Sequence, residues 1–182
     1  MDLENEILKE HSKRQTVRIA LWIGDDPKRF KELMELFLHG DYVVTQRAAW
    51  IVSECFDRSP QLIPPWLPAL LKKMQEPGVH DAVKRNTVRI LQFVDIPKRL
   101  LGTAVSACFD FLNSPDTPIA VKANAMTVLL HAAEREPGLR RELEASIELQ
   151  VPSMIPALCA RSRIVMKRLK KTSDERLATP SR

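Results

Sequence analysis

The stretch Asp41–Cys55, DYVVTQRAAWIVSEC, decides the fold of this chain. Its apolar residues recur at helical spacing, so the stretch predicts a helix with one apolar face, formed by Val44, Ala48, Ile51, Val52 and Cys55. The opposite face is predicted to carry Gln46, Trp50 and Glu54. A helix of this length does not bury such a face alone, because most helical stability in proteins comes from tertiary packing. The stretch therefore needs neighbouring helices.

Two further stretches repeat the pattern of Val44–Val52. Residues 83–91, VKRNTVRIL, and residues 121–129, VKANAMTVL, match it position for position. The three copies begin roughly 40 residues apart, which is the period of two-helix repeats. We expect their shared apolar positions to be buried between helices: Val44, Ala48, Ile51, Val83, Thr87, Ile90, Leu91, Val121, Ala125, Val128 and Leu129.

Proline and glycine divide the rest of the chain into similar helical segments. We predict an all-α fold, an α–α superhelix in which about five antiparallel helix pairs stack as a right-handed solenoid. Its inner helices are predicted near residues 12–23, 42–56, 80–94, 117–133 and 153–171. Residues 1–171 are expected to form a single domain. Residues 172–182, TSDERLATPSR, lack apolar periodicity and are expected to form a flexible basic tail.

The pattern D-x-x-V-x-x-R-A-A-x-x-V at residues 41–52 resembles HEAT and armadillo repeats. The chain is also similar to small bacterial HEAT-like proteins, through the segment Lys122–Met126 and a closing basic helix that contains Arg161–Lys167. The resemblance covers roughly residues 10–171. It implies a helical-repeat scaffold that presents an extended surface for binding and does not by itself imply a reaction.

Composition narrows the class of protein. Hydrophobic residues make up 45% and charged residues 28%, as expected of a globular helical protein. No apolar run approaches the roughly 20 residues that span a bilayer, and the N-terminus is too polar for a signal peptide. We therefore expect a cytoplasmic protein with no membrane contact.

The formal net charge of +5 is not spread evenly. Residues 160–182 hold eight Lys or Arg and two acidic residues, so this end accounts for the excess positive charge. The rest of the chain is close to neutral. The overall charge is therefore weak evidence for nucleic-acid binding.

The repeat register aligns basic residues beside the apolar stripe. One ladder across successive inner helices runs Arg14, Gln46, Arg85, Ala123, Arg161, and the ladder four residues on begins Arg18, Trp50, Arg89. We predict that the functional surface is a basic strip with one exposed aromatic, formed by Arg14, Arg18, Trp50, Arg85, Arg89, Lys122 and Arg161. Such a strip suits carboxylates or phosphates. The alternative is that these cations pair with acids of neighbouring helices and serve structure.

Three functions stay open. The first is a non-enzymatic scaffold that binds a protein or acidic peptide segment through the concave face of the solenoid. The second is nucleic-acid binding through the basic ladders. The third is DNA base excision of the kind performed by helical-repeat glycosylases of the AlkD type, with Trp50, Arg89 and either Asp95 or Glu54 in the active site.

Motifs for catalysis or cofactor binding are missing from the sequence. There is no nucleophile elbow, phosphate-binding loop or Ser/His/Asp arrangement, so we predict no catalytic residues and no cofactor. Cys55, Cys108 and Cys159 are far apart and lie in apolar helical segments, so we expect core thiols and not metal ligands. The position that holds Gln15, Arg47, Asn86, Asn124 and Ser162 is polar in every repeat and is expected to satisfy nearby backbone groups.

Overall fold

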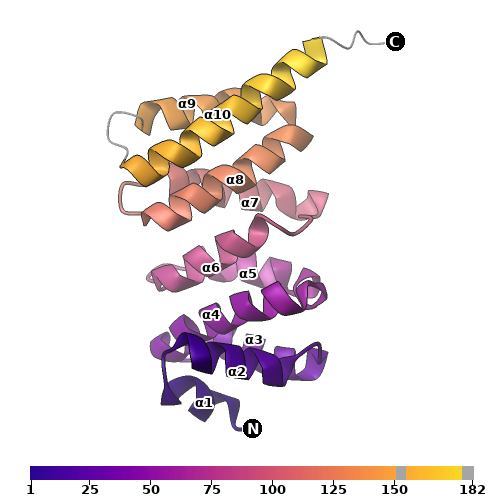
Figure 1. The fold of residues 1–182 in the computed structure, drawn as a ribbon, viewed down its shortest axis with the longest axis vertical. Helices are drawn as coiled ribbons and strands as arrows, with labels where there is room; N and C mark the ends of the chain where they lie inside the picture. The colour runs from indigo at the N-terminus through magenta and orange to yellow at the C-terminus, as the bar shows by residue number, and fades with distance from the viewer. Residues whose placement is uncertain (151–154, 178–182) are drawn as a thin grey trace. The chain divides into compact units, whose positions relative to one another are not determined.

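The computed structural model describes residues 1–150 and 155–177, with side chains up to residue 171 (Figure 1). In this part of the chain ten α-helices and three short 3₁₀ helices follow one another. They form two compact units, Met1–Ile96 and Pro97–Arg182. Unit 1 contains α1 (Leu3–Lys9), α2 (Lys13–Ile23), α3 (Pro27–His39), α4 (Tyr42–Arg58), η1 (Pro60–Leu62), η2 (Pro64–Trp66), α5 (Leu67–Lys73) and α6 (Asp81–Leu91). Unit 2 contains α7 (Lys98–Asn113), α8 (Ile119–Arg135), η3 (Pro137–Leu139), α9 (Arg140–Gln150) and α10 (Pro156–Leu177).

Helix α4 is the centre of unit 1. It packs against α2 on one side, α6 on the other and α3 behind, so α2, α4 and α6 form one layer (Figure 1). Side chains from all these helices bury its apolar stripe, with Val44, Ala48 and Val52 at most 1% exposed. The stretch that decides the fold thus lies at the middle of this core.

Local sequence signals set the helix starts in unit 1. The side chains of Ser12 and Asp26 accept hydrogen bonds from backbone N–H groups in the first turns of α2 and α3, and Pro27 opens α3. The imidazole of His80 accepts from the N–H of Ala82 at the start of α6. The turn between α3 and α4 needs Gly40, because a Cβ there would lie 2.5 Å from the Leu36 carbonyl oxygen and 2.7 Å from Val44 Cγ1.

Unit 2 is built around α8, which packs against α7, α9 and α10. Its apolar residues Val121, Ala125 and Leu129 are at most 1% exposed. Cys108 of α7 is fully buried in the same core.

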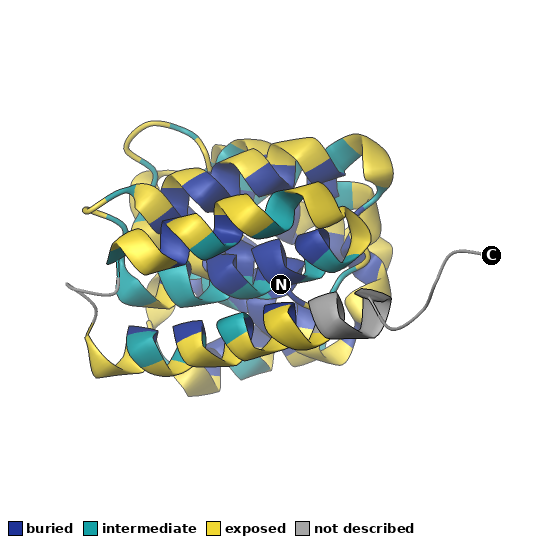
Figure 2. Cartoon of the chain, turned by 90° about the horizontal axis from the view of Figure 1, so that it is seen from above, coloured by how far each residue is buried: buried dark blue, intermediate teal, exposed yellow. Residues whose placement is uncertain are grey.

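The structure confirms the all-α class and the burial pattern. All eleven residues predicted to be buried in the inner helices are at most 3% exposed. Figure 2 shows buried and exposed residues on different faces of individual helices. The five predicted inner helices correspond to α2, α4, α6, α8 and α10. The repeat register derived from Val44–Val52 is therefore correct.

Three sequence predictions need correction. Glu54, predicted on the polar face of α4, is only 7% exposed, because Lys13 and Arg58 pair with its carboxylate. The helix predicted to reach residue 94 ends at Leu91 and continues as a turn. Helix α10 continues past residue 171 to Leu177, within the predicted tail, while residues 151–154 and 178–182 lie outside the described residues.

Candidate functional site

A polar pocket of about 360 Å³ opens over α2, α4 and α6 of unit 1. We call it the seam pocket. It contains three residues of the predicted basic strip, Trp50, Arg85 and Arg89, which come from two helices. The full set of lining residues is Lys13, Trp50, Ser53, Glu54, Asp57, Arg85, Asn86 and Arg89.

Arg89 is committed to a pair that joins α6 to α4. Its Nη2 donates to both carboxylate oxygens of Asp57 at 2.8 and 2.9 Å, and its Nη1 donates to the Ser53 hydroxyl at 2.8 Å. This geometry holds the guanidinium in one orientation. Arg89 therefore forms a fixed wall of the pocket.

Lys13 makes a second pair across helices, with Glu54. The ammonium of Lys13 on α2 bonds the carboxylate of Glu54 on α4, and Arg58 donates to the other carboxylate oxygen at 3.0 Å. Burial of Glu54 alone would raise the pKa of its carboxyl, but the hydrogen bonds from Lys13 and Arg58 outweigh that effect and hold the pKa below its usual value of 4.5. Glu54 is thus an ionised structural acid.

Arg85 differs from the other cations of the pocket. Its side chain is exposed, and it forms no ion pair or hydrogen bond with any side chain in the described part of the chain. Trp50, half-buried, supplies an apolar wall to the same pocket and contacts His11 edge-on, with ring centroids 5.7 Å apart. The pocket therefore combines one unpaired cation with one partly exposed aromatic.

The other predicted strip residues have different surroundings. On α2, Arg14 pairs with Glu10 at 3.2 Å, and Arg18 pairs with Glu6. In unit 2, Lys122 donates to Gln150 Oε1 at 3.3 Å, and Arg161 donates to the Thr127 hydroxyl at 2.8 Å. Pairing with neighbouring acids, the structural alternative for the strip, thus describes Arg14, Arg18 and Arg89.

The polar position shared by the repeats has the backbone role predicted for it. The side-chain nitrogen of Gln15 donates to the Glu6 carbonyl at 2.7 Å, and Arg47 donates to the carbonyls of Ile7 and Leu8 at the end of α1. Asn86 donates to the Ala82 carbonyl at 2.8 Å. The bonds of Gln15 and Arg47 satisfy carbonyl groups of α1 and tie this helix to α2 and α4, whereas the bond of Asn86 lies within α6.

Sequence reasoning missed Ser53 and Asp57 as members of the pocket. Both lie within two turns of Trp50 on α4, at spacings that return to the same face of the helix. This spacing in the sequence could have predicted that Ser53 and Asp57 lie on the same side of α4 as Trp50. Their bonds to Arg89 depend on how α4 and α6 pack, which local patterns do not specify.

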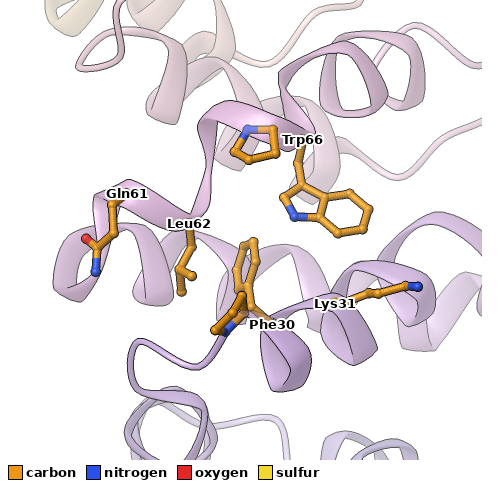
Figure 3. A pocket seen from close by; sticks show the side chains of 7 residues that line it. Phe30, Lys31, Gln61, Leu62 and Trp66 are labelled. Atoms are coloured by element: carbon orange, nitrogen blue, oxygen red, sulfur yellow. The ribbon is translucent and has the colours of Figure 1, made fainter.

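An apolar pocket of about 350 Å³ lies elsewhere in unit 1, between α3 and the two 3₁₀ helices (Figure 3). Trp66 meets Phe30 there nearly edge-on, with ring centroids 6.5 Å apart. Trp66 thus packs between the second 3₁₀ helix and α3. The lining residues are Pro27, Phe30, Lys31, Gln61, Leu62, Pro65 and Trp66.

Cys55 and Cys108 are buried in the core as predicted, whereas Cys159 of α10, also predicted to be a core thiol, is only half-buried. Burial raises the pKa of both Cys55 and Cys108 to about 12, so neither is ionised at neutral pH. Among the described residues, no group of three or more His, Cys, Asp or Glu side chains could hold a metal ion. No described helix has the length and apolar character needed to cross a bilayer.

Base excision of the glycosylase type would need a carboxylate that is available to act on a ligand in the seam pocket. Glu54 is held by Lys13 and Arg58, Asp57 is held by Arg89, and Asp95 does not line the pocket. A catalytic carboxylate must be within hydrogen-bond reach of the group it acts on. Both carboxylates that line the pocket are thus already held by cations.

Comparison with known proteins agrees with this fold. The family model of the HEAT repeat domain matches residues 3–169. The chain belongs to the HEAT repeat domain family. The match spans both compact units of this HEAT repeat chain and includes every residue of the predicted strip. Searches of curated proteins and of solved structures give no significant match.

Proposed function

We propose that this HEAT repeat chain is an interaction scaffold that binds an acidic segment of another protein in the seam pocket. Helices α2, α4 and α6, which border the pocket, are three of the inner helices expected to line the concave face of the repeat. The observation that carries the proposal is Arg85, an exposed guanidinium that has no partner among the described residues and lies beside the aromatic wall of Trp50.

The chemistry of the pocket favours a carboxylate as the group that is bound. Each carboxylate of the pocket already has a cation, since Glu54 pairs with Lys13 and Asp57 with Arg89. Arg85 then remains as a positive charge that a ligand can neutralise. A planar guanidinium binds a carboxylate through two parallel hydrogen bonds, and Trp side chains are frequent anchors in protein interfaces.

The paired arginines give less support to nucleic-acid binding through the strip. Phosphate contacts along a duplex need several available cations, because each phosphate neutralised adds to affinity through counterion release. In unit 1, Arg14, Arg18 and Arg89 are engaged by Glu10, Glu6 and Asp57. A segment with a few carboxylates fits this arrangement better than a phosphate backbone.

The test compares two arginines that sequence alone treats as equivalent. A fluorescent peptide rich in Glu and Asp is titrated with the full chain and with the Arg85→Ala and Arg89→Ala variants. A Lys-rich peptide and a random DNA duplex serve as alternative ligands. Arg85→Ala is expected to weaken binding of the acidic peptide about tenfold without lowering the melting temperature.

Arg89→Ala is expected to lower stability by about 1 kcal/mol, because it breaks the bonds from Arg89 to Asp57 and Ser53. Arg99→Ala is the matched control, since Arg99 is an exposed arginine of α7 that forms no ion pair among the described side chains. Acidic-peptide binding that is unaffected by Arg85→Ala would exclude the seam pocket. DNA binding that is tighter than peptide binding and lost in the same variant would favour the nucleic-acid alternative.

A further inference from the structure

An exposed aromatic ring lies at the end of the helix that carries Arg85. Phe93, just beyond the end of α6, is 68% exposed. One face of its ring stacks on Phe56 of α4, with centroids 6.3 Å apart and planes at 28°. Phe56 itself is buried, so Phe93 is supported by the core while most of its surface faces solvent.

Phe93 belongs to the same seam as the pocket. Along α4 and α6, Tyr42 meets His80 near the helix starts and Asp57 meets Arg89 near the ends, while Phe93, one turn beyond Arg89, contacts Phe56 beside Asp57. The first two contacts advance in the same direction along both helices, so α4 and α6 run parallel, side by side (Figure 1). Arg85, Arg89 and Phe93 follow one another at intervals of four residues, so they lie along one side of α6 and the turn that follows it.

The spacing between Arg85 and Phe93 sets a length for the ligand. Eight residues of helix rise by about 12 Å. Although α6 ends at Leu91, the helical rise also applies to the next residue, because Gln92 keeps helical backbone angles. An extended peptide covers about 12 Å in three to four residues.

Polar groups between these two points suit an extended backbone. The Ser53 hydroxyl accepts a hydrogen bond from Arg89 and keeps its own proton to donate. Asn86 donates to the Ala82 carbonyl, and its side-chain oxygen accepts no hydrogen bond from any described residue. One donor and one acceptor thus line the pocket for a peptide C=O and N–H, groups that a helical ligand already uses internally.

We infer that the ligand is an extended acidic segment with a large apolar side chain three or four residues from the bound carboxylate. This inference rests on the proposed function and adds the second contact point. The carboxylate pairs with Arg85, and the apolar side chain covers the exposed face of Phe93. Burying apolar surface on a supported aromatic ring supplies affinity that a single exposed charge pair does not.

The experiment varies spacing in short Ser-based peptides that carry a Glu–Asp pair and one Leu. The Leu lies one, four or eight residues from the acidic pair, and a fourth peptide has Ser in place of Leu. Affinity for the full chain is measured by fluorescence anisotropy. The peptide with a spacing of four is expected to bind about tenfold more tightly than the peptide without Leu.

Variants of Phe93 separate this inference from the proposed function. Phe93→Ser should remove the advantage of Leu and leave the Arg85-dependent affinity of the peptide without Leu unchanged, whereas Phe93→Leu should retain the advantage. The control is Ile164→Ser, because Ile164 of α10 is an apolar residue that is 62% exposed and lies in unit 2.

Two outcomes overturn the inference. Arg85-dependent binding that is equal for all spacings, or unaffected by Phe93→Ser, contradicts the second contact point and leaves the proposed function standing. If none of the peptides binds in an Arg85-dependent way, the proposed function fails and this inference fails with it.

Discussion

Leu91 of α6 and Leu129 of α8 occupy the same position of the repeat and are 2% and 1% exposed. Leu91→Ala or Leu129→Ala is expected to lower the free energy of unfolding by about 2–5 kcal/mol, through lost burial and the cavity left behind. Urea denaturation followed by circular dichroism measures the loss. Leu21→Ala is the control, because Leu21 is 62% exposed on α2 and should change stability by less than about 0.5 kcal/mol.

The ion pairs of Glu54 predict how the stability of the fold depends on pH. Its pKa in the folded chain lies below 4.5, so its ion pairs stabilise the fold above that pH and are lost as pH falls through the lowered value. Glu54→Gln is expected to cost about 1–2 kcal/mol at neutral pH. The difference from the parent should shrink well below pH 4.5, where the native carboxyl is also protonated.

Thermal unfolding at neutral and at acidic pH measures this difference. Glu32→Gln is the control, since Glu32 is an exposed acid of α3 without an ion pair among the described side chains. A deficit of Glu54→Gln that stays constant down to acidic pH would show that the pairs with Lys13 and Arg58 do not stabilise the fold.

At the scale of helices, local signals were sufficient for the starts but not for the contacts. Asp26 and Pro27 set the beginning of α3, because capping needs only neighbouring residues. Apolar periodicity predicted the buried faces of α4, α6 and α8 for the same reason. The burial of Glu54 depends on Lys13, which is 41 residues away, and no local pattern specifies that pair.

In the candidate site too, the sequence predicted which residues align but not which contacts they make. The repeat register placed Trp50, Arg85 and Arg89 close together, and they do share one pocket. It could not distinguish Arg85 from Arg89, because the distinction depends on Asp57 of the neighbouring helix. Register predicts which positions align, whereas packing decides which charges are already neutralised.

Alanine substitutions at two glycines, Gly40 and Gly102, compare a crowded position with an open one. Gly40→Ala is expected to destabilise the chain by about 1–3 kcal/mol, because the new Cβ would lie 2.5 Å from the Leu36 carbonyl oxygen. Gly102 is an exposed residue within α7, and nothing lies within 4 Å of a Cβ placed there. Gly102→Ala is therefore expected to stabilise by about 0.5–1 kcal/mol, through helix propensity.

Melting temperatures of the two variants, compared with the parent, give the result. Both substitutions add the same methyl group, but only Gly40→Ala places it against Leu36 and Val44, so a loss of stability confined to that variant reports the close contact at the turn between α3 and α4. A stable Gly40→Ala chain would mean that this turn tolerates a wider separation of the two helices.

At the scale of the whole molecule, charge is divided between two kinds of surface. Within the part of the chain that the structure describes, the seam pocket of unit 1 has a single unpaired cation, Arg85, among paired charges. Helix α10 of unit 2 instead presents Arg163, Lys167 and Lys170, which are exposed and form no ion pair with the described side chains. The first arrangement suits a specific carboxylate, and the second suits any polyanion at low salt.

This division predicts that weak DNA binding and acidic-peptide binding come from different residues. Replacing Arg163, Lys167 and Lys170 together with Gln should remove most of the affinity for a random duplex at low salt. If all three meet phosphates, the slope of log affinity against log salt becomes less negative by about 2.7, since each phosphate contact contributes about 0.9. Affinity for the acidic peptide should stay unchanged in this variant, because the seam pocket is intact.

Arg85→Ala should show the reverse behaviour, with weaker peptide binding and an unchanged salt slope for DNA. Gel-shift and anisotropy titrations at several salt concentrations measure both quantities on the same protein, with Arg99→Gln as the control for loss of one exposed cation. If Arg85→Ala instead changed the DNA slope by about 0.9, the pocket would contact phosphate. Carboxylate recognition at Arg85 and polyanion binding at α10 would then no longer be separable, and the basic ladder would have to act as one surface.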